Sequence, residues 1–380
     1  MMTSKILHIA KDEKFIDSAI NQFGSLNFID NDFFILNECS ELNYIKQKEK
    51  VNCFKTSSYI INKLNQYRII FFHSLDADFI PIVLSTNKNQ TCIWMCFGYE
   101  VYNDSFYVDK KNLYAELTLK HTTFTPVSIQ KKLKNYLRPI KRIIYRDTPF
   151  TPQELKIKAI RRMDYLVSSY KEEYSKISGY IHQKKKQLDF TYYPLEYIVN
   201  VNDLEIKTTN QILVGNSGTL TNNHLDVFKK IYYENLNNYT ILCPLSYGDK
   251  VYIEKIKIKG KFYFKDYFSP ITNFLPLEDY NQLIRTSSIA IFYNFRQQAI
   301  GNIIASLWYG AKVFLSKKNS FFSLLKSNGI IVFDFDKSNL NVYEPLNINQ
   351  ITHNRLILKN LFSEKRLLEK LSSEIDNLIK

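Results

Sequence analysis

The feature that most constrains the fold is a repeated alternation between short, continuously apolar segments and stretches of helical periodicity. A strand that is buried on both faces is apolar at every position, so this pattern is typical of a parallel sheet with helices on both sides. In the first half of the chain such strands are predicted at residues 6–9, 33–36, 68–72, 91–95 and 165–168.

The same pattern restarts near residue 206. A predicted strand at 211–214 is followed by a tight turn at 215–218 and a helix at about 222–233. Further strands are predicted at 239–243, 289–293, 312–315 and 329–333, and helices at 252–258, 277–287 and 301–309. We therefore expect an α/β protein of two Rossmann-like domains, at 1–205 and 206–353, followed by a C-terminal helix at 354–380.

The bulk properties fit two globular domains. The 380 residues are 45% hydrophobic and 15% aromatic, which excludes global disorder. The five cysteines (39, 53, 92, 96 and 243) include no C-x-x-C pair and are interpreted as reduced packing residues. Neither a secretory signal nor an apolar segment of roughly 18 residues is visible, so we expect a cytosolic protein.

One segment, at about 103–160, does not follow the alternation. Residues 110–162 hold fourteen Lys or Arg against three acids, which accounts for most of the net charge of +14. Within it, residues 129–144 form a predicted amphipathic helix whose cations lie off the apolar face: Lys131, Lys132, Lys134, Arg138, Lys141 and Arg142. These cations predict contact with an anionic membrane surface; the alternative is a helix packed on the sheet with solvated lysines.

The turn after the strand at 211–214 reads as a phosphate site. Gly215 and Gly218 allow a ligand to approach the backbone, and Ser217 offers a hydroxyl. The free amides of the following helical turn, near Asn222 and Asn223, favour an anion beyond the strand end. The turn is neither a P-loop nor a G-x-G-x-x-G motif. A simple helix cap is the alternative.

The residues of this motif, V-G-N-S followed by N-N-H, resemble a motif of the TDP-Fuc4NAc:lipid II Fuc4NAc transferases. These enzymes are the 4-alpha-L-fucosyltransferases of glycosyltransferase family 56. That family adds 4-acetamido-4,6-dideoxygalactose to the lipid-linked precursor of enterobacterial common antigen. Four more segments resemble its motifs in the same order: F-F-H at 71–73, I-W-M-C-F-G-Y-E-V-Y at 93–102, P-L-S-Y-G at 244–248 and F-R-Q-Q-A-I-G at 295–301.

The resemblance covers about residues 65–100 and 160–335, and the segment at 103–160 is an insertion relative to it. It implies a GT-B architecture in which the second domain binds a nucleotide-sugar and the first binds the acceptor. It also implies no cofactor and no essential metal. Two positions depart from the family pattern: Glu100 stands where the family has aspartate, and Phe97 where it has tryptophan.

Roles follow from the resemblance and from chemistry. Arg296 would stabilise the leaving nucleoside diphosphate, because a guanidinium binds phosphate with two hydrogen bonds. Gln297 and Gln298 would bind sugar or ribose hydroxyls, and Tyr247 would stack on the base or the sugar. The complete predicted donor site is Gly215, Asn216, Ser217, Asn223, His224, Tyr247, Arg296, Gln297, Gln298 and Gly301.

A direct displacement also needs a base that takes the proton of the acceptor hydroxyl. Glu100 ranks first, because it keeps a carboxylate at the family's aspartate position, and His73 ranks second. A reaction that retains the anomeric configuration would need no such base.

The predicted function is transfer of a Fuc4NAc-like sugar from a dTDP-sugar to a polyprenyl-linked or other membrane-held glycan, by a peripheral protein on the inner face of the cell membrane. The alternatives are a GT-B transferase with a UDP- or GDP-sugar, and a non-catalytic protein that binds nucleic acid or glycan. No recognised nucleic-acid-binding motif supports the last of these, so we expect no nucleic-acid partner.

Overall fold

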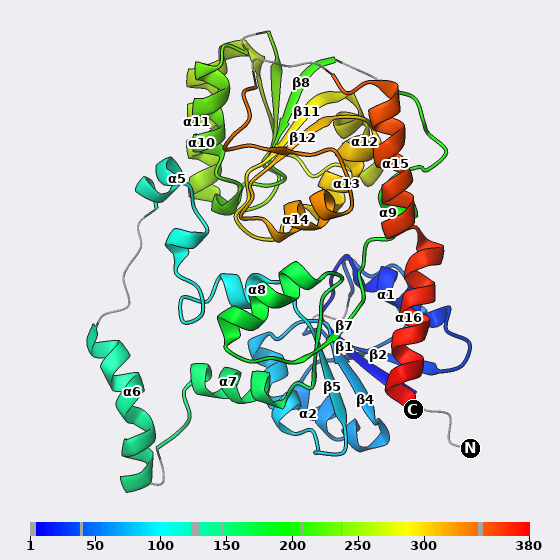
Figure 1. Cartoon of the computed structure of the whole chain (residues 1–380). Coiled ribbons are helices and arrows are strands. Elements are labelled where there is room, and N and C mark those ends of the chain that lie inside the picture. The colour runs from blue at the N-terminus through cyan, green and yellow to red at the C-terminus, as the bar shows by residue number, and fades with distance from the viewer. Residues whose placement is uncertain are drawn as a thin grey trace.

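The computed structural model describes residues 5–38, 41–122, 129–145, 148–206, 209–236, 238–340 and 345–380. Figure 1 shows two α/β halves, one above the other, each built around a parallel sheet. The predicted fold class, α/β with two Rossmann-like sheets, is confirmed. No helix in these ranges is both long enough and apolar enough to cross a membrane.

The first half contains a seven-stranded sheet in the order β3-β2-β1-β4-β5-β6-β7. Successive residues of its strands enter different cores: in β4, Phe71 joins the core on one face, and Phe72 joins the core on the other. That double burial explains why the strands are apolar at every position. The strands are β1 (Lys5–Ala10), β2 (Asp30–Leu36), β3 (Val51–Phe54), β4 (Ile69–Phe72), β5 (Thr91–Met95), β6 (Tyr165–Val167) and β7 (Lys186–Leu188).

Helices connect these strands and cover the sheet. Helices α1 (Ile16–Gly24), α7 (Pro152–Arg162) and α8 (Lys171–Ile181) pack apolar residues into its two cores. The shorter ones are α2 (Ser57–Ile61), α3 (Ile80–Leu84) and α4 (Tyr99–Tyr102).

The second half contains a six-stranded parallel sheet in the order β10-β9-β8-β11-β12-β13. Its strands are β8 (Thr209–Val214), β9 (Thr240–Pro244), β10 (Phe268–Ile271), β11 (Ser287–Phe292), β12 (Lys312–Leu315) and β13 (Phe333–Asp334). Its helices are α10 (His224–Tyr233), α11 (Lys250–Phe264), α12 (Leu277–Thr286), α13 (Ile300–Trp308) and α14 (Ser320–Ser327). The strand predicted at 329–333 was misplaced, because the chain joins β12 only at Phe333 and Asp334.

The C-terminal segment forms two helices where one was predicted. After α9 (Leu195–Ile198) and the second sheet, α15 (Ile348–Phe362) packs Leu358 and Phe362 into the core around Trp308. The chain leaves helical geometry at Ser363, and α16 (Glu364–Ile379) begins in a new direction. Leu371 and Ile375 of α16 enter the core of the first half, so the end of the chain joins both halves.

The insertion lies between β5 and β6 and contains α5 (Glu116–Lys120), α6 (Ile129–Ile144) and α7. Asp226 of α10 accepts hydrogen bonds from the amides of Leu117 and Thr118, at 2.8 and 3.0 Å, which holds α5 against the second half. In Figure 1, α6 stands away from the body of the protein. The alternative in which this helix packs on the sheet is therefore wrong.

Candidate active site

A cavity of about 420 Å³ lies between the two halves, a size that fits a small-molecule ligand. Both halves contribute to its wall. The second half provides Asn216, Ser217, Thr219, Tyr247, Arg296, Gln297, Gln298, Ala299 and Ile300. The first half provides, among others, Glu13, Phe15, Cys96, Phe97, Tyr99, Ser168, Glu173, Tyr174, Tyr192 and Tyr193.

The loop after β8 is shaped by a glycine and by one buried amide. Gly215 has φ +69°, and a Cβ there would lie 2.8 Å from Nε2 of His224. Nδ2 of Asn222 donates to the carbonyl oxygen of Ser217 at 2.8 Å, which fixes the turn from inside. The turn directs Asn216 and Ser217 to the cavity, whereas Gly215 does not line it.

Asn223 and His224, which were predicted to contact the donor, lie behind this loop. Oδ1 of Asn223 accepts from the amide of Ala115 at 2.9 Å, and its Nδ2 donates to the carbonyl of Tyr293 at 2.8 Å. His224 is fully buried, and burial lowers its pKa to about 3, so its imidazole is neutral. Neither residue lines the cavity, and both support the loop.

A second loop, after β9, meets the first one at close range. Gly218 and Gly248 form an isolated bridge, and a Cβ on Gly248 would lie 2.4 Å from the carbonyl carbon of Gly218. This contact places the half-exposed Tyr247 in the cavity wall, where its hydroxyl accepts from Nδ2 of Asn216 at 3.3 Å. Tyr247, which was predicted to stack on the base or the sugar, therefore lies beside the loop after β8 in the cavity wall.

The loop after β11 supplies Arg296, Gln297 and Gln298. Gln298 joins two loops, because its Oε1 accepts from the Thr221 hydroxyl at 2.7 Å and its Nε2 donates to Oδ1 of Asn216 at 3.0 Å. All three residues line the cavity. Gly301, at the start of α13, does not line it, and a Cβ there would meet only Tyr193, at 3.8 Å.

Arg296 is a partly buried cation in the cavity wall. Its Nη1 donates to the carbonyl of Gln297 at 3.4 Å, and its guanidinium carbon lies 5.7 Å from the ring centre of Tyr102. Nε has no hydrogen-bond partner within the described ranges. Burial lowers the pKa of Arg296. A partly buried guanidinium whose buried Nε donor is unused favours a bound anion.

Glu173, at the start of α8, is a buried carboxylate that was not predicted from the sequence. It accepts a 2.9 Å hydrogen bond from the Tyr102 hydroxyl and another from the hydroxyl of Ser320 in the second half. Burial raises its pKa, and the positive charges of Lys176 and Arg296 oppose that rise. No motif in the sequence marks this residue, because its partners are more than 70 residues away.

Two predicted base candidates, Glu100 and His73, do not line the cavity. Glu100 is 5% exposed, its Oε1 accepts from the amide of Leu75 at 3.3 Å, and burial raises its pKa to about 7. Nε2 of His73 lies 2.9 Å from Nδ1 of His8, and its Nδ1 lies 2.5 Å from the Tyr192 hydroxyl. Both ring nitrogens of His73 are therefore occupied.

The carboxylate that does face the cavity from an exposed position is Glu13, in the loop after β1. Partial burial raises its pKa, and the negative charges of Asp76 and Asp12 raise it further. The described ranges contain no group of three or more His, Cys, Asp or Glu side chains that could hold a metal ion. Asp76 and Asp78 instead form ion pairs with Lys11, at 3.7 and 2.7 Å.

Comparisons with solved structures show the fold at low sequence identity. A glycosyltransferase from Rickettsia africae superimposes with a TM-score of 0.59 at 13% identity, over 100% of both chains. Sucrose-phosphate synthase from Thermosynechococcus elongatus gives 0.59 at 8%, over 99% of both chains. The N-terminal domain of trehalose-6-phosphate phosphatase from Candida albicans gives 0.60 at 9%, over 100% of this chain and 97% of that one.

Comparison of the sequence with models of protein families finds one match. Residues 173–356 match the model of the family described as 4-alpha-L-fucosyltransferase, glycosyl transferase group 56. The matched segment includes every second-half residue that lines the cavity, from Asn216 to Ile300. Over these residues the chain matches the group 56 glycosyltransferase family, and as a whole it has the GT-B type of fold, with parallel sheets of seven and six strands.

Proposed function

We propose that the protein transfers a deoxy-amino sugar of the Fuc4NAc type from a dTDP-sugar to a lipid-linked glycan at the inner face of the cell membrane. The observation that carries this proposal is the position of Arg296. Its partly buried guanidinium lies in the wall of the same cavity as Ser217 and Gln298, and its Nε has no hydrogen-bond partner among the described residues. The match of residues 173–356 to the group 56 family supports the choice of sugar and nucleotide.

In this proposal the donor diphosphate lies between the loop after β8 and the loop after β11. The Ser217 hydroxyl and the Asn216 side chain hold one phosphate, and Arg296 neutralises the charge that develops on the leaving dTDP. Gln297 and Gln298 bind hydroxyls of the ribose or the transferred sugar. Tyr247, at the cavity edge, stacks on the base.

The proposed reaction is a direct displacement at the anomeric carbon. The acceptor oxygen forms a bond to that carbon while its bond to the diphosphate oxygen breaks, and the hydroxyl proton moves to a carboxylate. Glu13 suits this role better than Glu100, because Glu13 faces the cavity and Glu100 lies behind its wall. Its raised pKa makes it a better proton acceptor than an ordinary glutamate.

The direct test is turnover with a panel of donors. Purified protein is incubated with a lipid-linked glycan and a dTDP-, UDP- or GDP-linked deoxy-amino sugar, and release of the free nucleotide is measured. We expect release only from the dTDP-sugar, and only with acceptor present. Release from a UDP- or GDP-sugar would keep the transferase assignment and replace the donor, whereas no release from any donor would contradict the proposal.

A further inference from the structure

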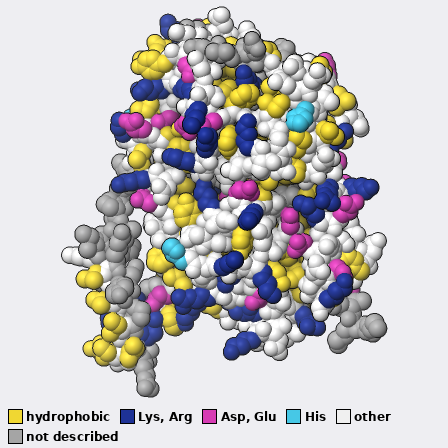
Figure 2. Space-filling model, in the orientation of Figure 1, with side chains coloured by type: hydrophobic (Ala, Val, Ile, Leu, Met, Phe, Trp, Pro, Cys, Tyr) yellow, Lys and Arg dark blue, Asp and Glu magenta, His cyan; other side chains and the backbone are white. Residues whose placement is uncertain are grey.

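The protruding helix α6 leaves an apolar face uncovered. Residues at spacings of four and three along the helix, Leu133, Leu137, Ile140 and Ile144, share one side, and Ile143 lies next to them. Their exposed fractions are 57, 46, 53, 69 and 79%, respectively. Figure 2 shows hydrophobic side chains gathered on this part of the molecule. No side chain in the described ranges covers this row.

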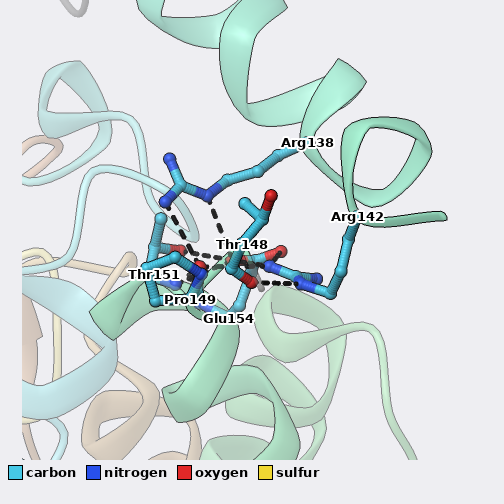
Figure 3. A network of polar contacts seen from close by, with 6 residues as sticks. All are labelled: Arg138, Arg142, Thr148, Pro149, Thr151 and Glu154. Atoms are coloured by element: carbon cyan, nitrogen blue, oxygen red, sulfur yellow. Dashed lines mark hydrogen bonds and ion pairs between the residues drawn. The ribbon is translucent and has the colours of Figure 1, made fainter. Parts of the chain in front are cut away.

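The opposite side of α6 is attached to α7 (Figure 3). Nη2 of Arg142 contacts Glu154 at 3.0 Å, and its Nε donates to the carbonyl of Thr148 at 3.1 Å. Nη2 of Arg138 donates to the carbonyl of Pro149 at 3.2 Å. Glu154 also caps α7, because it accepts from the amide of Thr151 at 2.8 Å.

These contacts revise the role predicted for two of the six cations. Arg138 and Arg142 point to α7 and brace the helix, so they are not free to bind lipid headgroups. Lys141 is exposed, and the side chains of Lys131, Lys132 and Lys134 lie outside the part of the chain that the structure describes. Because Arg138 and Arg142 attach one side of α6 to α7, the opposite side, which carries the apolar row, faces outward.

An exposed apolar row of this kind is unfavourable in water and indicates a contact surface. The helix has 16 residues, fewer than the roughly 20 that a membrane-spanning helix needs. A short helix with one apolar face and a basic remainder has the features of a segment that lies in the plane of a membrane surface.

The apolar row could contact either a lipid surface or a second copy of the chain, and the charge of the helix distinguishes these two partners. The helix carries six cations and no acid, and residues 110–162 carry an excess of eleven positive charges. In a symmetric dimer through this row, two strongly positive segments would face each other, which is unfavourable. An anionic bilayer surface offers both an apolar layer and the opposite charge.

We propose that α6 docks the protein on anionic lipid, with Leu133, Leu137, Ile140, Ile143 and Ile144 inserted between the headgroups. The brace from Arg138 and Arg142 to Glu154 then holds the cavity at a set distance from the lipid surface. The proposal deepens the proposed function, since it rests on an acceptor that is held at the membrane.

The test is co-sedimentation with vesicles of phosphatidylcholine, with and without phosphatidylglycerol. The variant replaces Ile140, Ile143 and Ile144 with Glu. A matched control replaces Val251, Ile258 and Phe262 with Glu; these α11 residues are similarly exposed, at 82, 68 and 71%. We expect the α6 variant to lose binding to the anionic vesicles by more than about tenfold, because insertion depends on buried apolar area. The α11 variant should bind nearly as the original protein does.

Three outcomes would overturn the proposal: unchanged binding of the α6 variant, equal loss in both variants, or a dimer in light scattering that only the α6 variant dissociates. Release of nucleotide with a short, water-soluble acceptor is measured in parallel. Both variants should keep that activity. A loss of vesicle binding with intact turnover therefore tests the docking surface, whereas an inactive original protein would count against the proposed function.

Discussion

The hydroxyl of Tyr170, which precedes α8 in the first half, donates a 2.7 Å hydrogen bond to Oε1 of Gln297 in the second half. Three residues after Tyr170, in the first turn of α8, Glu173 accepts from Ser320, and Nζ of Lys176 donates to the carbonyl of Phe295 at 2.9 Å. The first turns of α8 therefore hold the loop that carries Arg296. We therefore expect donor binding by the second half to depend on these residues of the first half.

Tyr170→Phe should release Gln297 without creating a cavity. A hydrogen bond of this kind contributes about 0.5–1.5 kcal/mol, so kcat/KM for the donor should fall roughly two- to tenfold. The melting temperature should change little. Tyr232→Phe, on the exposed side of α10, is the matched control. Donor kinetics equal to those of the control would show that this contact does not position the loop.

Arg296→Ala should reduce kcat by roughly a hundredfold or more, because the leaving diphosphate loses its fixed positive charge. Arg296→Lys should recover only part of the rate, since an ammonium lacks the two-pronged geometry. Steady-state kinetics and circular dichroism separate catalysis from folding. Arg366→Ala, which removes an exposed 3.6 Å pair with Glu369, is the control and should stay active. Normal turnover by Arg296→Ala would refute the phosphate role.

Glu13→Gln should reduce kcat by about a hundredfold if its carboxylate accepts the acceptor proton, because general-base catalysis contributes about 10² to 10⁴. Donor binding should be nearly unchanged. Glu100→Gln is the informative comparison, since both changes replace a carboxylate by an amide. If Glu100→Gln is inactive and Glu13→Gln is not, the assignment of the base returns to Glu100.

Glu100 should also make folding stability depend on pH. Burial raises its pKa to about 7 from an ordinary 4.5, so the folded protein holds a proton that the unfolded chain has lost between these values. The contribution of Glu100 to the free energy of unfolding is therefore fully present below pH 4.5 and is lost as the pH rises through 7. The total loss is about 3 kcal/mol.

Thermal melting of Glu100→Gln and of the original protein across pH 4.5 to 7.5 checks this sign. The variant should gain stability relative to the original protein as the pH rises. The buried histidines His8 and His224, whose pKa values burial lowers to about 3, act in the opposite direction and cancel in the difference. A difference that does not vary with pH would contradict the raised pKa of Glu100.

The sequence predicted the doubly covered strands well, because double burial leaves an unbroken apolar run, as in β4 and β11. It missed β3, β7 and β10, which are short strands of mixed polar and apolar residues at the edges of the sheets. An edge strand buries less of its surface, so its pattern does not differ from that of a loop. The boundary between α15 and α16 was also missed, since both helices continue one periodic pattern across Ser363.

For the site, local motifs predicted cavity residues in the loops after β8 and β11, such as Ser217 and Arg296. The motifs could not distinguish these residues from neighbours such as Asn223 and His224, whose side chains face the protein interior. Adjacent residues of a loop point in different directions, and the sequence does not show which of them face the cavity. Glu13 and Glu173 come from the other half of the chain and carry no motif. Only the packing of the two halves brings them to Arg296.

The most direct test of the central claim is a thermal-shift measurement with dTDP, UDP, GDP and CDP, made on the original protein and on Arg296→Ala. We expect a rise in melting temperature with dTDP alone, and a smaller rise or none in the variant. Equal shifts with all four nucleotides, or a dTDP shift that Arg296→Ala leaves unchanged, would contradict it.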